Sequence, residues 1–243
     1  MTVFATITSI TIRALLGRRR TLLMALLAAM PIFLGLIVRA NDDALDLRIL
    51  GQTLDGLVIR TVLPLVAIVF GTAALGSELE DGTAVFLLTT PVDRWQIIVA
   101  KTLVAGTLTA VLVVPGAVIG GIIMGGTSSE AIAVTFAFAL ASIVGAYLYT
   151  AIFLVLSVFT SRGLIIGLVY ALIWEGIVAG LLPGSQVVSV REYLTGIVQT
   201  LAPEAGRTSL VGASGFLYAA VAFVLTLALG SVRLARYEVR GAE

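Results

Sequence analysis

The sequence predicts an all-α, polytopic membrane protein with six transmembrane helices, an N-terminal amphipathic interfacial helix, and a short outer helix between spans five and six. Hydrophobic residues make up 59% of the 243 residues and charged residues only 12%, whereas an ordinary soluble domain carries about 25% charged residues. The mean hydropathy is +1.12. The apolar residues also gather into six runs near the roughly 20 residues that a bilayer core requires. We expect one transmembrane domain over residues 1–243.

The composition also limits the chemistry of the chain. It contains no cysteine and no histidine, which excludes disulfides, thiolate metal sites and imidazole general bases. Residues 212–215 read GASG, the GxSG pattern of rhomboid-type intramembrane serine proteases, but those enzymes need a histidine to accept the serine proton. No GxxxxGK[ST] nucleotide-binding loop is present. We therefore expect no catalytic residue, no metal site, no bound cofactor and no nucleic-acid partner.

The first twenty residues favour an amphipathic helix that lies in the membrane interface and ends at three arginines, Arg18 to Arg20. Apolar residues recur there at near-helical spacing, as Val3, Phe4, Ile7, Ile10, Ala14 and Leu15. The apolar run at 21–38 is too long for the hydrophobic region of a secretory signal, although residues 38–40 loosely resemble a cleavage site. We therefore predict the first span at 21–38.

The remaining spans are predicted at residues 57–75, 97–124, 131–159, 163–182 and 215–232. Thr127 and Glu130 have the spacing of a capping box, which predicts that the fourth span begins there, after a tight glycine turn. Glycine pairs at four-residue spacing, such as Gly116 and Gly120, predict close approach between helices.

The distribution of Lys and Arg predicts that both termini are cytoplasmic, in a multi-pass protein of the cell (inner or plasma) membrane. With the N-terminus inside, the inner segments hold Arg13, Arg18, Arg19, Arg20, Arg94, Lys101, Arg162, Arg233, Arg236 and Arg240. The outer segments hold only Arg39, Arg48, Arg60, Arg191 and Arg207.

Charged residues persist in the inner segment between spans two and three, which is the candidate contact with soluble partners. Its candidate site residues are Glu78, Glu80, Asp81, Gly82, Thr83, Phe86, Leu87, Leu88, Pro91, Arg94 and Lys101. Gly82 and Pro91 would bracket a short helix, and apolar side chains such as Phe86 and Leu88 would fill a pocket on a partner protein. Two alternatives are open: a solvated loop, or a segment whose Phe86 and Leu87 return to the membrane interface.

Glu175, beside Trp174 in the outer half of span five, is the only acidic residue well inside a predicted span. An intramembrane carboxylate is costly, so it indicates either a substrate pathway or a paired structural role. In the structural interpretation, it accepts hydrogen bonds from a neighbouring helix end or lies near the headgroups. Arg60, near the outer end of span two, is its predicted counter-charge. A lone carboxylate would also suit a proton-coupled carrier, but the other spans offer no partner base.

The outer segment between spans five and six carries a helical apolar stripe, which predicts a second interfacial or re-entrant helix. Its residues are Val190, Tyr193, Leu194, Ile197, Val198 and Leu201.

The order of these parts resembles the ABC-2 type transporter permeases. The resemblance rests on the leader ending in arginines, the six spans, an acidic-GT-LL-P-R-K segment after span two, and a WEG sequence in span five. The matching residues are Glu78, Glu80, Gly82, Thr83, Leu87, Leu88, Pro91, Arg94, Lys101, Trp174, Glu175 and Gly176.

The resemblance implies the function of each part. The segment after span two would form a coupling helix in a cleft of a separate ABC ATP-binding subunit, which would bind ATP and Mg. The helix between spans five and six would form an outer gate, and a second permease copy or paralogue would complete an exporter. Such exporters move drugs, antibiotics, ions, lipids or polysaccharides. The alternative is a secondary, ion-coupled transporter without an ATPase.

Overall fold

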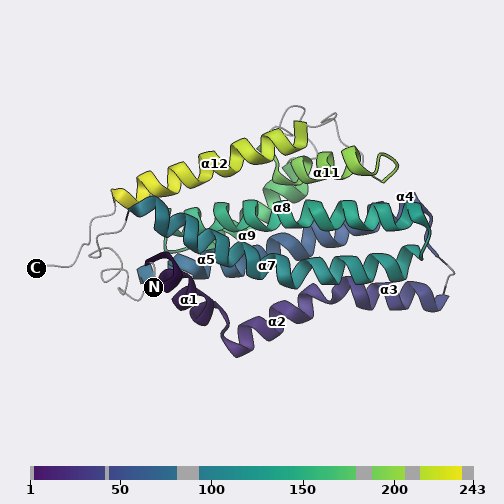
Figure 1. Ribbon diagram of the computed structural model, residues 1–243, viewed down its shortest axis with the longest axis horizontal. Helices are drawn as coiled ribbons and strands as arrows, with labels where there is room; N and C mark the ends of the chain where they lie inside the picture. Colours follow the sequence, from purple (N-terminus) through teal and green to yellow (C-terminus); the bar gives the residue numbers. More distant parts are fainter. Residues whose placement is uncertain (1–2, 42–43, 81–92, 179–187, 206–213, 237–243) are drawn as a thin grey trace, which may run out of the picture.

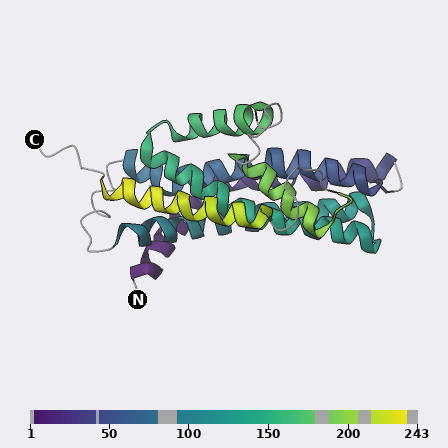
Figure 2. The ribbon, with the colours of Figure 1, turned by 90° about the horizontal axis from the view of Figure 1, so that it is seen from above.

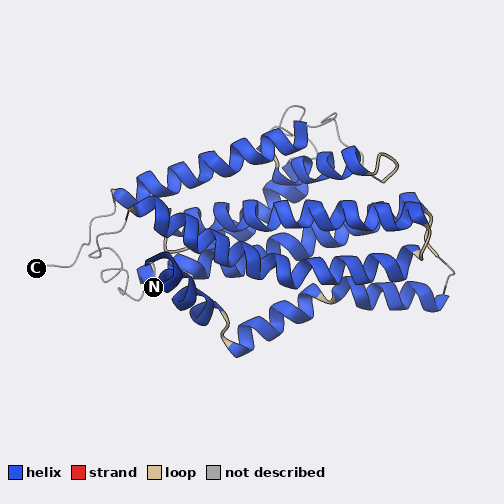
Figure 3. Ribbon diagram, in the orientation of Figure 1, coloured by secondary structure: helices blue, strands red, loops and turns tan. Residues whose placement is uncertain are grey.

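The computed structural model describes residues 3–41, 44–80, 93–178, 188–205 and 214–236, and all regular structure in these ranges is helical (Figure 3). The helices are α1 (Val3–Leu15), α2 (Arg18–Ala28), α3 (Met30–Asn41), α4 (Leu47–Leu54), η1 (Asp55–Val62), α5 (Leu63–Glu80), α7 (Arg94–Gly125), α8 (Ser129–Phe159), α9 (Gly163–Val169), η2 (Tyr170–Val178), α11 (Val190–Leu201) and α12 (Ser214–Ala235). The segments η1 and η2 are π-helical.

The predicted all-helical membrane fold is confirmed. Within the described ranges, five helical stretches are long and apolar enough to cross a membrane, namely Arg19–Asn41, Leu47–Gly76, Arg94–Gly125, Ser129–Phe159 and Ser214–Ala235. They match five of the predicted spans. The predicted span at 163–182 is represented by the shorter apolar helix Gly163–Gly176, and its last four residues lie outside the described ranges.

The long helices α7 and α8 form the centre of the bundle, with α5 packed against both. Figure 1 shows α2 and α3 along one face and α12 along the opposite face, and only 17% of each of these outer spans is buried, against 61% for α8. The view in Figure 2 shows α9 and η2 on a third side, where α9 packs on α8 and α5. The beginning of α1 and the ends of α5 and α12 lie at one end of the bundle (Figure 1).

The second span begins ten residues earlier than predicted, because helix α4 starts at Leu47 and continues through η1 into α5. From the sequence alone, this charged segment is expected to be a loop. The structure accommodates its charges inside the helix, where Asp55 and Arg60 pair with each other at 2.8 Å.

Two helix boundaries also differ from the predictions. The leader helix α1 ends at Leu15, and Arg18 opens α2, so the arginines begin the first span. The cap of α8 is Ser128, whose side chain accepts a hydrogen bond from the amide of Ala131 at 3.2 Å. The predicted cap, Thr127, lies one residue before the observed cap. The turn that precedes α8 begins at Gly126, whose φ of 76° is in the left-handed region.

The predicted close approach at the glycines of α7 is confirmed. A Cβ atom on Gly120 would lie 2.5 Å from the carbonyl oxygen of Pro31, and one on Gly116 would overlap the carbonyl of Ala28. These carbonyls lie at the break between α2 and α3, where Pro31 has no amide proton to continue the helix. The glycines therefore let α7 pack directly on the broken helix.

Candidate functional site

Glu175 caps the first turn of helix α11. The side chain is 4% exposed, and its Oε2 accepts a hydrogen bond from the Ser189 hydroxyl at 2.7 Å and from the Arg191 amide at 3.3 Å. Its Oε1 accepts one from the Val190 amide at 2.9 Å and one from the Tyr170 hydroxyl at 2.8 Å. All four partners donate, and the carboxylate faces the positive end of the helix dipole, so an ionised Glu175 is satisfied without a cation.

The π-helix η2 explains why Tyr170 reaches Glu175. A π-helix bonds residues five apart, so side chains at i and i+5 lie over one another. Tyr170 and Glu175 have this spacing and meet across the widened turn. The periodicity of an ordinary α-helix would not place them together, so Tyr170 cannot be recognised as a partner of Glu175 from the sequence alone.

The N-terminus of α11 has a second cap in its own sequence. The Ser189 hydroxyl oxygen accepts a hydrogen bond from the Glu192 amide at 3.3 Å while the hydroxyl donates to Glu175. Ser189 and Glu192 have the spacing of a capping box, a sequence signal that could have located the start of this helix.

A second carboxylate, Asp55 of η1, also contacts α11. Asp55 pairs with Arg60 at 2.8 Å and with Arg191 at 3.7 Å, and it accepts a hydrogen bond from the Thr195 hydroxyl at 3.3 Å. The predicted pairing of Arg60 with Glu175 is therefore wrong: the π-helical turn places Arg60 five residues after Asp55, against that carboxylate.

Five of the six residues of the apolar stripe predicted for α11 face the bundle, whereas Leu201 at the end of the helix is 45% exposed. Helix α11 packs against α8, α12 and η1, and every one of the five candidate gate residues is at most 6% exposed: Val190, Tyr193, Leu194, Ile197 and Val198. The helix approaches α12 so closely that a Cβ on Gly215 would lie 2.7 Å from the Tyr193 carbonyl oxygen.

Tyr193 belongs both to the apolar packing of α11 and to the surroundings of the Glu175 carboxylate. Its ring stacks on that of Tyr218 at 5.9 Å between centroids. Burial, followed by the negative charge of Glu175, raises the pKa of the Tyr193 phenol, which therefore stays protonated at neutral pH. Trp174 is partly buried, and its indole N–H has no hydrogen-bond partner among the described residues.

At the other end of the bundle, Lys101 is buried where α5 and α7 meet. Its Nζ donates to Glu78 Oε1 and to the Ala74 carbonyl oxygen, both at 2.7 Å, and the Lys101 side chain is 1% exposed. An ammonium group buried this deeply depends on these partners. The pair therefore fixes the end of α5 against the first turns of α7, at the base of the 81–92 segment.

The structure divides the predicted partner-contact residues into two groups. Glu78 and Glu80 belong to α5, and Arg94 and Lys101 belong to α7, so Lys101 lies inside the bundle and not on the predicted contact surface. The others lie outside the described residues: Asp81, Gly82, Thr83, Phe86, Leu87, Leu88 and Pro91. The described ranges contain no group of three or more acidic residues that could hold a metal ion.

Comparison with known proteins gives one family. The family model described as ABC-2 family transporter protein matches residues 7–239. No curated protein matches the chain.

Proposed function

The chain belongs to the ABC-2 transporter family, and on this basis we propose that it is the membrane-spanning permease subunit of an ATP-driven ABC exporter. The match over residues 7–239 is the observation that carries the proposal, since it covers nearly the whole helical bundle. The chain has no catalytic site of its own, and a separate ATP-binding subunit holds ATP and Mg. A second copy or a paralogue completes the permease.

The ATP-binding subunit docks on the segment between α5 and α7. Support comes from the base of this segment, where the Lys101–Glu78 pair joins the two helices. A buried pair of this kind transmits a displacement of the segment to both spans, because breaking it would leave an unpaired buried ammonium.

The chain crosses the membrane six times, with both termini in the cytoplasm. The Lys and Arg distribution supports this orientation, and so does the position of the start of α1 and the end of α12 at the same end of the bundle (Figure 1). The short helix Gly163–Gly176 and the residues that follow it form span five, and α1 lies along the inner membrane face.

Helix α11 forms the outer gate, and Glu175 holds it in place. The four hydrogen bonds to Glu175 support a structural role over a place in the substrate path, because a carboxylate saturated by donors has little capacity left for a ligand. They also argue against the ion-coupled alternative, in which Glu175 would have to exchange these hydrogen-bond partners for a coupling ion.

Purification of the tagged chain from its native membrane tests the proposal. We expect an ATP-binding protein to co-purify and to hydrolyse ATP in the complex, with no hydrolysis by the chain alone. The matched control is an ATP-binding subunit whose P-loop lysine is replaced, which should assemble but not support transport. Transport by the purified chain alone, driven by an ion gradient, would refute the proposal and identify a secondary carrier.

A further inference from the structure

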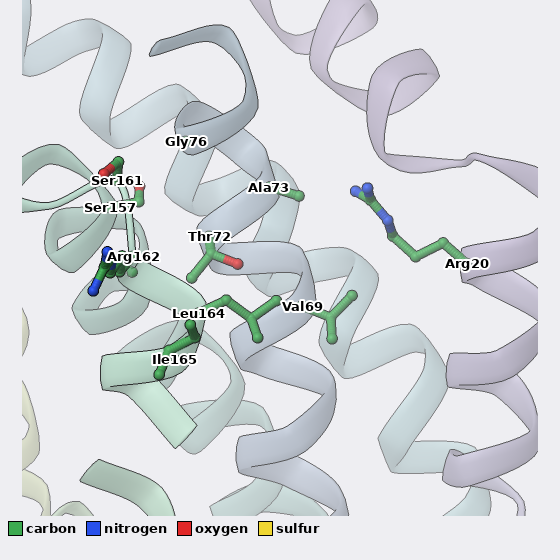
Figure 4. A pocket seen from close by; sticks show the side chains of 11 residues that line it. Arg20, Val69, Thr72, Ala73, Gly76, Ser157, Ser161, Arg162, Leu164 and Ile165 are labelled. Carbon is green, nitrogen blue, oxygen red and sulfur yellow. The ribbon is translucent and has the colours of Figure 1, made fainter. Parts of the chain in front are cut away.

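A pocket of about 330 Å³ opens at the end of the bundle where α2 and α9 begin and where α5 and α8 end. Figure 4 shows the residues of α5, including Thr72 and Ala73, between Arg20 on one side and Arg162 on the other. The pocket thus brings together cations from two different parts of the chain. Neither arginine takes part in the contacts that Glu175 and Asp55 make with α11, or in the Lys101–Glu78 pair.

The pocket offers hydrogen-bond donors and positive charge, and none of the described residues that line it is acidic. Arg20 and Arg162 are both exposed, and in the described part of the chain neither guanidinium has an ion pair, whereas Arg60 and Arg191 share Asp55. The hydroxyl of Thr72 already donates to the Ile68 carbonyl oxygen at 2.6 Å. The arginines are therefore the main donors available to a ligand, and they favour an anion.

Apart from Ser157 and Ser161, the rest of the lining consists of apolar residues and glycines. Val69 and Ala73 lie four residues apart on α5, and Leu164 and Ile165 open α9. Leu164 is 45% exposed and Ile165 60% exposed, although both belong to an apolar helix. The ligand that fits this lining has a negative group beside a hydrocarbon chain.

We propose that this pocket binds an anionic phospholipid, with the positive charge of Arg20 and Arg162 attracting the phosphate and the acyl chain against the apolar lining. Guanidinium groups match phosphate oxygens through paired N–H donors, and basic pockets between spans at the membrane surface are suited to lipid headgroups. The site is independent of the proposed permease function, since it needs no ATP-binding subunit.

The test measures lipid retention by native mass spectrometry. The full chain is purified in detergent and mixed with phosphatidylglycerol and phosphatidylcholine in equal amounts. We expect the chain to retain phosphatidylglycerol, and the double variant Arg20→Gln, Arg162→Gln to bind it about tenfold more weakly, as loss of a charge-assisted hydrogen bond predicts. The matched control, Arg19→Gln with Arg236→Gln, removes the same charge from exposed positions outside the pocket. Equal losses in the two double variants would overturn the proposal.

Two further measurements separate the possible sources of the phosphate. Ala73→Leu keeps both arginines but fills the apolar floor, so we expect it to reduce lipid retention as well. Inorganic phosphate at millimolar concentration should not raise the melting temperature of the wild-type chain as phosphatidylglycerol does. Equal stabilisation by inorganic phosphate, or unchanged retention in Ala73→Leu, would show that the acyl chain has no part in binding and would overturn the lipid assignment.

Discussion

Replacing Glu175 by Gln tests whether this carboxylate anchors α11. The substitution keeps the size of the side chain but turns one of its oxygens into an NH₂ group. Two of the four donors, either the pair on Oε1 or the pair on Oε2, then face another donor. A hydrogen bond to a charged group contributes about 1.5–3 kcal/mol, so the loss of two, with partial relaxation, costs about 3 kcal/mol.

Scanning fluorimetry and hydrogen exchange measure this loss. A change of about 3 kcal/mol should lower the melting temperature by about 6–12 °C, since each kcal/mol corresponds to roughly 2–4 °C in a domain of this size. Hydrogen exchange should rise first at the amides of Val190 and Arg191, which donate to the carboxylate. The matched control is Glu130→Gln, an exposed acid in the first turn of α8, which should change stability by no more than about 0.5 kcal/mol.

The outcome distinguishes the two roles of Glu175. Lower stability, faster exchange in α11 and weaker assembly would support the structural role. Lost transport in a complex that keeps its melting temperature and its ATP hydrolysis would refute it and place Glu175 in the substrate path. Unchanged transport together with unchanged stability would leave the residue with neither role.

Three further predictions concern the rest of the bundle. Lys101→Met should lower stability, because it removes the charged donor that joins Glu78 and the Ala74 carbonyl; we expect a loss of about 1.5–3 kcal/mol by thermal unfolding, and an unchanged melting temperature would contradict the proposed role of this pair. Phe86→Asp should release the ATP-binding subunit from a permease that still inserts, since an uncompensated charge in a desolvated contact costs about 3–5 kcal/mol; a full complement of that subunit after purification would exclude docking there. Reporter fusions at Asp46 and Ser189 should read as external, and an internal signal at Ser189 would overturn the proposed topology.

The sequence was sufficient for those features that depend on hydrophobicity alone. The lengths of the apolar runs located five spans, because each span must by itself contain enough apolar residues to cross a bilayer. The apolar stripe of α11 located that helix and its buried face in the same way. The start of span two was missed, because paired charges such as Asp55 and Arg60 resemble a loop until their partner is known.

The polar contacts of the site were not predictable by the same reasoning. Glu175 was singled out by its position, but its donors come from η2 and from a helix 14 to 16 residues further along the chain. Arg60 is the wrong partner for Glu175: both charges occur near outer span ends, but the π-helical turn that directs Arg60 to Asp55 has no clear sequence signature. Ser189 is an exception, because its capping-box spacing with Glu192 can be recognised in the sequence and predicts the start of α11.

The continuity of η1 and α5 connects the two ends of the candidate site. Asp55 contacts α11 through Thr195 and Arg191 at one end, and Glu78 pairs with Lys101 at the other. Both acids belong to one uninterrupted helical stretch from Asp55 to Glu80, and a packed helix moves as a rigid element. A displacement of α5 at the 81–92 segment must therefore either carry Asp55 with it or break the contacts of that carboxylate with α11. If α11 is the outer gate, this helix couples the gate to the segment on which the ATP-binding subunit is proposed to dock.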